Sequence, residues 1–358
     1  MKKIILLFSL IWQYHLSFAQ IDSLDIQIGQ MIMVGMSGHS VSANSPIITA
    51  IKKQHIGGVL LFELNLNPVQ TEQKLSKLTN DLQDAASIPL LISIDQEGGK
   101  VNRLKTKYGF VDMPSAKFIG TKNDDMYTRE TGVNTAQTLQ RCGININFAP
   151  VLDVDNPACP VLGKLQRCYS ADVEKIAHIA SIIMDAHQEQ GIKTVVKHFP
   201  GHGNSKTDSH KGLADVSKHW TKDELVPYKN LIAEGKIQAL MTAHIINRNI
   251  DPSGLPATLS KKVVNNLLRN TMGYKGVVFS DDMQMHAISK YYGFEESIKK
   301  AINAGVDILI FSNNIANAKW YTAENIHATI KKLVLKNEIK AERIKESYDR
   351  IMALKHSR

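Results

Sequence analysis

The amino-acid sequence predicts an α/β protein that folds as a single (β/α)8 barrel, and three observations support this fold class. Eight short apolar runs recur along the 358 residues, helix-like segments separate them, and polar residues follow the ends of most runs. Runs that are apolar throughout are typical of parallel strands whose two faces are both covered. A doubly wound sheet is the alternative, but no glycine-rich fingerprint follows the first run, so one barrel is the better match.

The elements can be placed one by one along the chain. The expected strands are residues 31–36, 57–62, 89–95, 145–154, 193–199, 238–245, 276–282 and 306–312. Helices are expected where apolar residues recur at spacings of three and four, at residues 71–86, 171–191 and 297–305. The last two segments end at Gly191 and Gly305, because glycine readily adopts the left-handed conformation that stops a helix.

The first 19 residues are predicted to be an export signal peptide. Lys2 and Lys3 provide a positive start, residues 4–12 form an apolar run too short to span a bilayer, and Ala19 ends a small-residue cleavage pattern. A buried amphipathic first helix is the alternative. We therefore expect residues 20–358 to form the mature barrel and the protein to be exported, to the periplasm if the cell is Gram-negative and otherwise to the medium. No other stretch is long and apolar enough to cross a membrane.

Charge and cysteine content give weaker indications. The formal net charge is +9, and the lysines are spread over helical segments instead of clustering beside aromatic residues. This pattern predicts a solvated basic surface and no nucleic-acid partner. The three cysteines have no metal-like spacing, but after export Cys159 and Cys168 can pair across one loop and leave Cys142 as a buried thiol. Nothing in the sequence indicates an oligomeric state.

Polar residues collect where the predicted strands end. Active sites of (β/α)8 barrels lie at the C-terminal ends of the strands, in the loops that follow. Helix capping accounts for one or two polar residues there, but not for so many at one rim. The residues in question are Asp95, Glu97, Asp153, Lys197, His198, His244, Asp281, Asp282 and Ser312.

The rim residues suit the binding and cleavage of a polyhydroxylated ligand. Asp281 and Asp282 emerge from an apolar run, so at least one of these carboxylates is expected to point into the barrel mouth, where a buried carboxylate is either paired or functional. Asp281 can then act as a nucleophile, or stabilise a positively charged transition state. Hydrogen-bonding partners for hydroxyl groups are offered by Asp95, Arg103, Lys197 and His198.

The stretch KHFPGHGNSKTDSH, residues 197–210, supplies a candidate acid. Asp208 and His210 are two residues apart, so in an extended segment they share a face, and the carboxylate can orient the imidazole. Glycines in the stretch predict a loop that can close over a substrate. The alternative is a zinc site made by His198, His202, Asp208 and His210, although the proline and glycines argue against the helix that would align the first two histidines.

At these residues the chain resembles glycoside hydrolase family 3, and within it the single-domain β-N-acetylglucosaminidases. The matching stretches are IDQEGGKVNRL (94–104), FAPVLDVDNP (148–157), KHFPGHG with DSH (197–203 and 208–210) and FSDDMQM (279–285). They occur in the family's order and extend over most of the mature chain. A further stretch, VLGKLQRCYSAD (161–172), is similar to the family's loop that carries a substrate-binding arginine, here Arg167.

The resemblance implies a retaining exo-β-N-acetylglucosaminidase that acts on amino-sugar oligosaccharides such as those derived from peptidoglycan. It implies that Asp281 forms a glycosyl-enzyme and that His210, partnered by Asp208, is the acid/base. It also implies that no metal or other cofactor takes part. The remaining positions carried over from the family are sugar-binding residues: Asp95, Arg103, Arg167, Lys197 and His198.

Two departures and three alternatives accompany the resemblance. Lys100 stands where the family usually has arginine after the EGG motif, which weakens the fork that positions neighbouring carboxylates. Two-domain relatives take their acid from a later domain, whereas this chain ends soon after its eighth unit, which favours His210.

Three alternative functions stay open. One is a glycoside phosphorylase, since a neutral histidine repels phosphate less than a carboxylate would. The others are another β-glycosidase and a non-catalytic glycan-binding protein.

Overall fold

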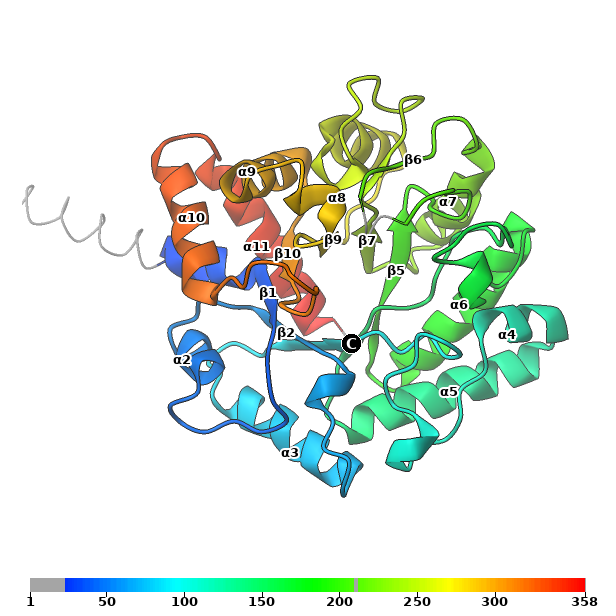
Figure 1. The fold of residues 1–358 in the computed structure, drawn as a ribbon, viewed down its shortest axis with the longest axis horizontal. Coiled ribbons are helices and arrows are strands. Elements are labelled where there is room, and N and C mark those ends of the chain that lie inside the picture. The colour runs from blue at the N-terminus through cyan, green and yellow to red at the C-terminus, as the bar shows by residue number, and fades with distance from the viewer. Residues whose placement is uncertain (1–22, 209–211, 358) are drawn as a thin grey trace, which may run out of the picture.

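Eight parallel strands close into a barrel in the computed structural model, which describes residues 23–208 and 212–357 (Figure 1). The strands are hydrogen-bonded in the order β1-β10-β9-β7-β5-β4-β3-β2, so each barrel strand neighbours the one before it in the chain, and the last closes on the first. The predicted fold class is therefore confirmed. The barrel strands are β1 (Ile32–Gly35), β2 (Gly58–Leu61), β3 (Leu91–Ile94), β4 (Ile146–Asn147), β5 (Lys193–Phe199), β7 (Ala239–Thr242), β9 (Val277–Asp282) and β10 (Ile308–Phe311).

Helices connect the strands and surround the barrel (Figure 1). The three predicted helices appear with slightly different ends: Asp172 begins one by accepting hydrogen bonds from the backbone N–H groups of residues 174 and 175, and Gly305 ends another with φ of 119°. The α-helices are α2 (Pro46–Lys52), α3 (Thr71–Asp84), α4 (Ala116–Lys122), α5 (Asp125–Arg141), α6 (Val173–Glu189), α7 (Val226–Ala233), α8 (His286–Ser289), α9 (Phe294–Ala304), α10 (Ala323–Leu335) and α11 (Ala341–His356).

Several shorter or wider helical turns complete the connections. A π-helix, η6 (Lys262–Thr271), precedes β9 and presents Val263, Val264 and Leu268 to the core. The 3-10 turns are η1 (Glu63–Asn65), η2 (Thr106–Tyr108), η3 (Gly163–Leu165), η4 (Lys222–Leu225) and η5 (Ala257–Leu259). No helix among the described residues is long and apolar enough to cross a membrane.

Two predicted strands are much shorter in the structure than the sequence indicates. The run at 145–154 gives only a two-residue β4, because Pro150 has no N–H group for the ladder, and beyond it a single bridge joins Val151 to Lys197. The run at 238–245 ends as β7 at Thr242. The chain then leaves the barrel, and β8 (Ile245–Ile246) pairs instead with β6 (Ala214–Asp215).

Cys159 and Cys168, which the sequence allows to pair, do not form a disulfide in the structure. Cys142, Cys159 and Cys168 are all free and buried, and the latter two lie in one small hydrophobic cluster. Burial raises the pKa of the Cys142 thiol to about 12 and the pKa of the Cys168 thiol well above its ordinary value. Because the thiolate is the form that reacts in disulfide exchange, burial also protects these thiols from oxidation.

Candidate active site

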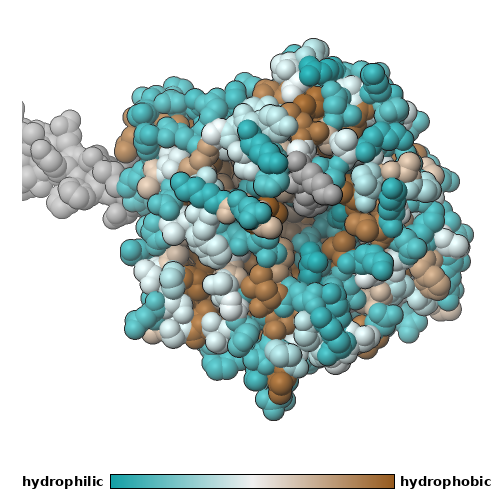
Figure 2. Space-filling model, in the orientation of Figure 1, coloured by the Kyte–Doolittle hydropathy of each residue, from teal (hydrophilic) through white to brown (hydrophobic). Residues whose placement is uncertain are grey.

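The predicted site residues surround one cavity at the C-terminal ends of the barrel strands. The cavity has a volume of about 360 Å³, within the range of small-molecule sites. Figure 2 shows a largely hydrophilic face with a hollow near its centre. His210 lies outside the described residues, as do residues 1–19. Every other predicted site residue lines the cavity: Asp95, Arg103, Arg167, Lys197, His198, Asp208 and Asp281.

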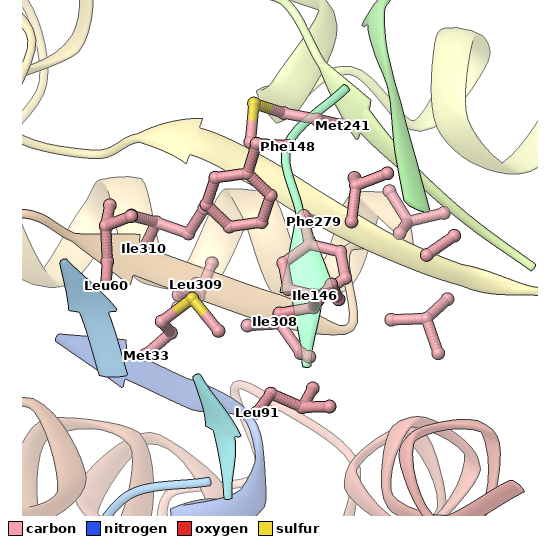
Figure 3. Close-up of a cluster of buried hydrophobic side chains, with 14 of the residues drawn as sticks. Met33, Leu60, Leu91, Ile146, Phe148, Met241, Phe279, Ile308, Leu309 and Ile310 are labelled. Carbon is pink, nitrogen blue, oxygen red and sulfur yellow. The ribbon is translucent and has the colours of Figure 1, made fainter. Parts of the chain in front are cut away.

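The floor of the cavity is the top of the barrel core. Figure 3 shows apolar side chains from several strands meeting inside the barrel, where the Phe148 ring packs edge-on against Phe279 at 5.6 Å between centroids. Leu60, Phe148, Met241 and Ile310 also line the cavity, so a ligand would rest on an apolar floor. The polar groups around this floor can therefore bind the hydroxyl groups of a ligand whose apolar face packs below.

The two carboxylates that end β9 have different surroundings. The Asp282 carboxylate accepts hydrogen bonds from the backbone N–H groups of Gln284 (3.1 Å) and Ser312 (3.2 Å) and from the Ser312 hydroxyl. Burial raises the pKa of Asp282 to about 6. Asp281 is only half-buried, and its Oδ1 accepts a hydrogen bond from the Asp282 N–H at 2.8 Å. Both residues line the cavity, but Asp281 is the more accessible to a ligand and Asp282 is buried.

An ion cluster joins three elements at one wall of the cavity. Arg167 donates twice to Glu97, from Nε and Nη2, with both distances 2.8 Å. Lys197, which is 2% exposed, places its Nζ 2.7 Å from Glu97 Oε1 and 2.7 Å from Asp95 Oδ1. Arg103 lies 3.6 Å from the other oxygen of Asp95.

The charges in this cluster support one another. Burial opposes the charged form of Glu97, yet Arg167 and Lys197 hold the pKa of this carboxyl well below its usual range. Burial likewise opposes the charge of Lys197, but Asp95 and Glu97 raise the pKa of its ammonium group. Glu97 and Lys197 therefore both carry their charges at neutral pH, and the cluster offers fixed donors and acceptors to a ligand.

Asp153 holds two histidines of the 197–208 segment. Its Oδ2 accepts hydrogen bonds from the His198 Nδ1 (2.6 Å) and from the His198 backbone N–H (3.2 Å). Its Oδ1 accepts one from the backbone N–H of His202 at 2.6 Å. With Nδ1 donating to Asp153, His198 Nε2 accepts from Arg167 Nη2 at 3.4 Å. Burial disfavours the Asp153 charge, but His198 lowers the pKa of this carboxyl.

The zinc alternative finds no support in the described part of the chain. Of the four residues in that alternative, His210 lies outside the described residues. Among residues 23–208 and 212–357, no group of three histidine, cysteine, aspartate or glutamate side chains could hold a metal ion. The segment is instead organised by Asp153, as the contacts above show.

The comparison with known proteins shows the family of the chain. The model of the glycosyl hydrolase family 3 N-terminal domain matches residues 23–354. The chain belongs to glycoside hydrolase family 3. Proteins named beta-hexosaminidase from Nitrosomonas eutropha and Tolumonas auensis are 35% and 34% identical to this glycoside hydrolase, over 72% and 80% of its chain and 74% and 84% of their own.

Solved structures of the family superpose well on this enzyme. A family 3 β-N-acetylglucosaminidase from Paenibacillus sp. str. FPU-7 matches with a TM-score of 0.84 and 36% identity, over 92% of this chain and 62% of the other. A β-N-acetylhexosaminidase from Beutenbergia cavernae matches with a TM-score of 0.83 and 27% identity, over 93% and 98%. The present chain thus spans about three-fifths of the Paenibacillus protein and nearly all of the Beutenbergia one.

The sequence did not single out all residues that organise the site of this family 3 enzyme. Glu97 and Asp153 were placed at the rim but not in the site, because their partners are distant in sequence. Glu224 gave no signal within a charged stretch, yet it is buried and its Oε1 accepts a hydrogen bond from Asn204 at 2.9 Å. Lys100, expected to affect the positioning of carboxylates, is exposed and does not line the cavity, and Glu97 is held by other cations.

Proposed function

We propose that this family 3 enzyme is a retaining exo-β-N-acetylglucosaminidase that removes terminal β-linked N-acetylglucosamine from amino-sugar oligosaccharides. The observation that carries the proposal is Asp281, a half-buried carboxylate near the end of β9 that lines the same cavity as Asp95, Arg167 and Lys197, whose polar groups suit the binding of hydroxyl groups. The names of the relatives, beta-hexosaminidase and β-N-acetylglucosaminidase, support the choice of sugar.

In the proposed mechanism, an Asp281 carboxylate oxygen attacks the anomeric carbon of the bound sugar. The bond to the leaving-group oxygen breaks, and His210 protonates that oxygen. A water molecule, deprotonated by His210, then attacks the glycosyl-enzyme and releases the sugar with its original anomeric configuration. Asp208 lines the same cavity and is proposed to orient the imidazole of His210.

The sugar-binding part of the site is proposed to work by preorganisation. Lys197 and Asp95 are already paired, so they can bind neighbouring hydroxyl groups without rearranging. Arg167 is held by two bonds to Glu97, and His198 by Asp153, which fixes where each ring or guanidinium donor points. Arg103, which lies beside the other carboxylate oxygen of Asp95, is proposed to bind a hydroxyl group of the sugar there.

We further propose that the natural substrates are peptidoglycan-derived fragments and that the enzyme acts outside the inner membrane. The support for export is the leader pattern of residues 1–19, which lie outside the described residues. Mass spectrometry of the protein recovered from its own cells tests this. Maturation at or near residue 20 supports export, and an intact first residue in a cytoplasmic fraction contradicts it.

Hydrolysis of 4-nitrophenyl β-N-acetylglucosaminide tests the function, with the matching β-glucoside as comparison. We expect the acetylated sugar to be preferred, with no dependence on phosphate and with the β-anomer released first in proton NMR spectra. Asp281→Ala should lower kcat by roughly 10⁴-fold or more while the protein stays folded, because the covalent step is lost. Release of sugar 1-phosphate would favour a phosphorylase, and near-normal turnover by the variant would contradict the role of Asp281.

A further inference from the structure

A second cavity lies beside the active-site cavity and shares a wall with it. Its volume is about 310 Å³, and it is formed by the end of β1, the loop that leads to α2, and the segment between β10 and α10. This last segment lies across the barrel face next to β1 (Figure 1). Asn313 lines the second cavity, whereas its neighbours Ser312 and Asn314 line the active site. One stretch of backbone therefore separates the two cavities.

The lining of this second cavity combines an aromatic ring with hydroxyl, amide and carboxylate groups. Its most prominent apolar member is Trp320, which is 51% exposed. The apolar walls are completed by Met36, Val41 and Ile47. The polar groups belong to Ser37, Ser40, Ser45, Asn313 and Glu324.

Trp320 is exposed in a segment whose backbone is fixed on both sides. The preceding carbonyl, of Lys319, accepts a hydrogen bond from Gln284 Nε2 at 2.6 Å. The following residue, Tyr321, exchanges two backbone hydrogen bonds with the Asn313 side chain (3.0 and 3.1 Å). Its ring also stacks on Phe294 with 3.9 Å between centroids. A large apolar ring held in water by a rigid segment is typical of a recognition surface.

The same bonds connect this segment to the residues beside Asp281. Gln284 Oε1 accepts a hydrogen bond from the Asn313 N–H at 2.7 Å, and the Gln284 N–H donates to Asp282. Ser312, the residue before Asn313, also donates to Asp282. The position of Trp320 relative to the active site is therefore set by hydrogen bonds, so a ligand that spans both cavities would meet two preformed sites.

We propose that the second cavity is a glycan subsite, in which a further pyranose ring of the substrate stacks on Trp320. A pyranose ring has apolar C–H faces and a rim of hydroxyl groups, which matches an aromatic face surrounded by serine hydroxyls, Asn313 and Glu324. This inference rests on the proposed function, because the ligand is the same amino-sugar oligosaccharide. It adds that the enzyme binds more of the glycan than the sugar it releases.

The kinetic test compares substrates of different length in Trp320→Ala and wild-type enzyme. For 4-nitrophenyl β-N-acetylglucosaminide, which has one sugar, kcat/KM should stay within twofold of wild type. For N-acetylglucosamine oligomers of three to five rings, KM should rise about tenfold with little change in kcat. Trp320→Phe should restore most of the affinity. The matched control is Phe118→Ala, which removes another exposed ring (53%), one that does not line either cavity.

Unchanged oligomer kinetics in Trp320→Ala would overturn the proposal. Equal losses on both substrates would also overturn it, because they would indicate that Trp320 positions the loop.

A binding measurement distinguishes failure of the subsite proposal from failure of the proposed function. The emission of Trp320 should shift when the N-acetylglucosamine trimer is added, and Trp320→Phe should abolish the shift, even if no substrate is hydrolysed. A shift produced equally by an apolar peptide would reassign the cavity to a peptide and also overturn the proposal.

Discussion

Two buried carboxylates at opposite ends of the barrel have similar ion partners but different surroundings. Glu97 follows β3 at the C-terminal end, is 3% exposed in its side chain and binds Arg167 and Lys197. Asp307 precedes β10 at the N-terminal end, is fully buried and binds three arginines, which are Arg269, Arg343 and Arg350, at 2.6, 3.0 and 3.0 Å. Burial opposes both charges, and the cations lower both pKa values.

The difference lies in what else the cations bind. At the N-terminal end, Arg269 also donates to the carbonyl of Gly276 and Arg343 to those of Ile302 and Val306, so this cluster ties α11 and η6 to the barrel. At the C-terminal end, Arg167 also donates to the carbonyl of Val161, but Lys197 binds a second carboxylate, Asp95, and Arg167, Lys197 and Asp95 all line the cavity. Burial and ion pairing alone therefore do not identify a functional carboxylate. It is identified by whether the cations that bind it also contact groups that line the cavity.

Removing the cation at the C-terminal end should have the largest effect. Lys197→Ala leaves Asp95 and Glu97 without their shared ammonium group, so we expect kcat/KM to fall by roughly 10³-fold, about 4 kcal/mol in transition-state binding. Lys193→Ala, on the same strand at the opposite end, is the matched control, because that lysine binds only the carbonyl of Ser357 among the described residues. Comparable losses in the two variants would contradict a site role for Lys197.

Removing the charge at the N-terminal end should affect stability instead. Asp307→Asn leaves three arginines around a neutral side chain, which should lower the free energy of unfolding by about 3–5 kcal/mol. The kcat of the folded fraction should stay within twofold of wild type. Ser347→Ala removes only one hydroxyl donor to Asp307, at 2.7 Å, and should cost about 1 kcal/mol. Urea unfolding measures the free energy of unfolding, and assays at equal concentrations of folded protein measure kcat. Normal stability with lost activity in Asp307→Asn would contradict a purely structural role for Asp307.

Much of the fold could be predicted from the sequence because barrel strands are continuous apolar runs, and the rule that sites lie at strand ends brought Asp95, Lys197 and Asp281 together. The prediction was wrong where one residue interrupts a run, as Pro150 does after β4. It also placed Glu97 at the rim without assigning it to the site, because its partner Arg167 lies 70 residues away on a loop that carries η3. Pairings across such distances depend on the folded geometry, which apolar periodicity does not encode.

Glu224 extends the comparison to a buried carboxylate that forms no ion pair with a lysine, arginine or histidine among residues 23–208 and 212–357. It lies under the 197–208 segment: Asn204 donates to its Oε1, and Gly201, with φ of 119°, approaches so closely that an added Cβ would lie 2.7 Å from Oε2. Asn204 in turn accepts from Asn156 at 2.9 Å, which links this segment to the loop that carries Arg167. Burial raises the pKa of Glu224 to about 7.

Replacing Glu224 should therefore have a smaller effect that depends on pH. Between about pH 4.5 and 7 the folded protein keeps a proton on Glu224 that the unfolded chain releases, so the free energy of unfolding falls as pH rises. Glu224→Gln cannot titrate, and its stability should fall by roughly 2–3 kcal/mol less over this range. Urea unfolding at pH 5 and pH 7.5 measures the difference. Asp282, whose pKa is about 6, contributes with the same sign in both proteins and cancels.

The control for this variant is Glu234→Gln, the same substitution at an exposed carboxylate that follows α7. It should leave the pH dependence of stability unchanged. If Glu224→Gln and wild type lose the same stability between the two pH values, Glu224 is ionised in the folded protein throughout that range. An ionised carboxylate would then be tolerated under the 197–208 segment without a cation beside it, unlike Glu97 and Asp307, whose charges are balanced by lysine and arginine side chains.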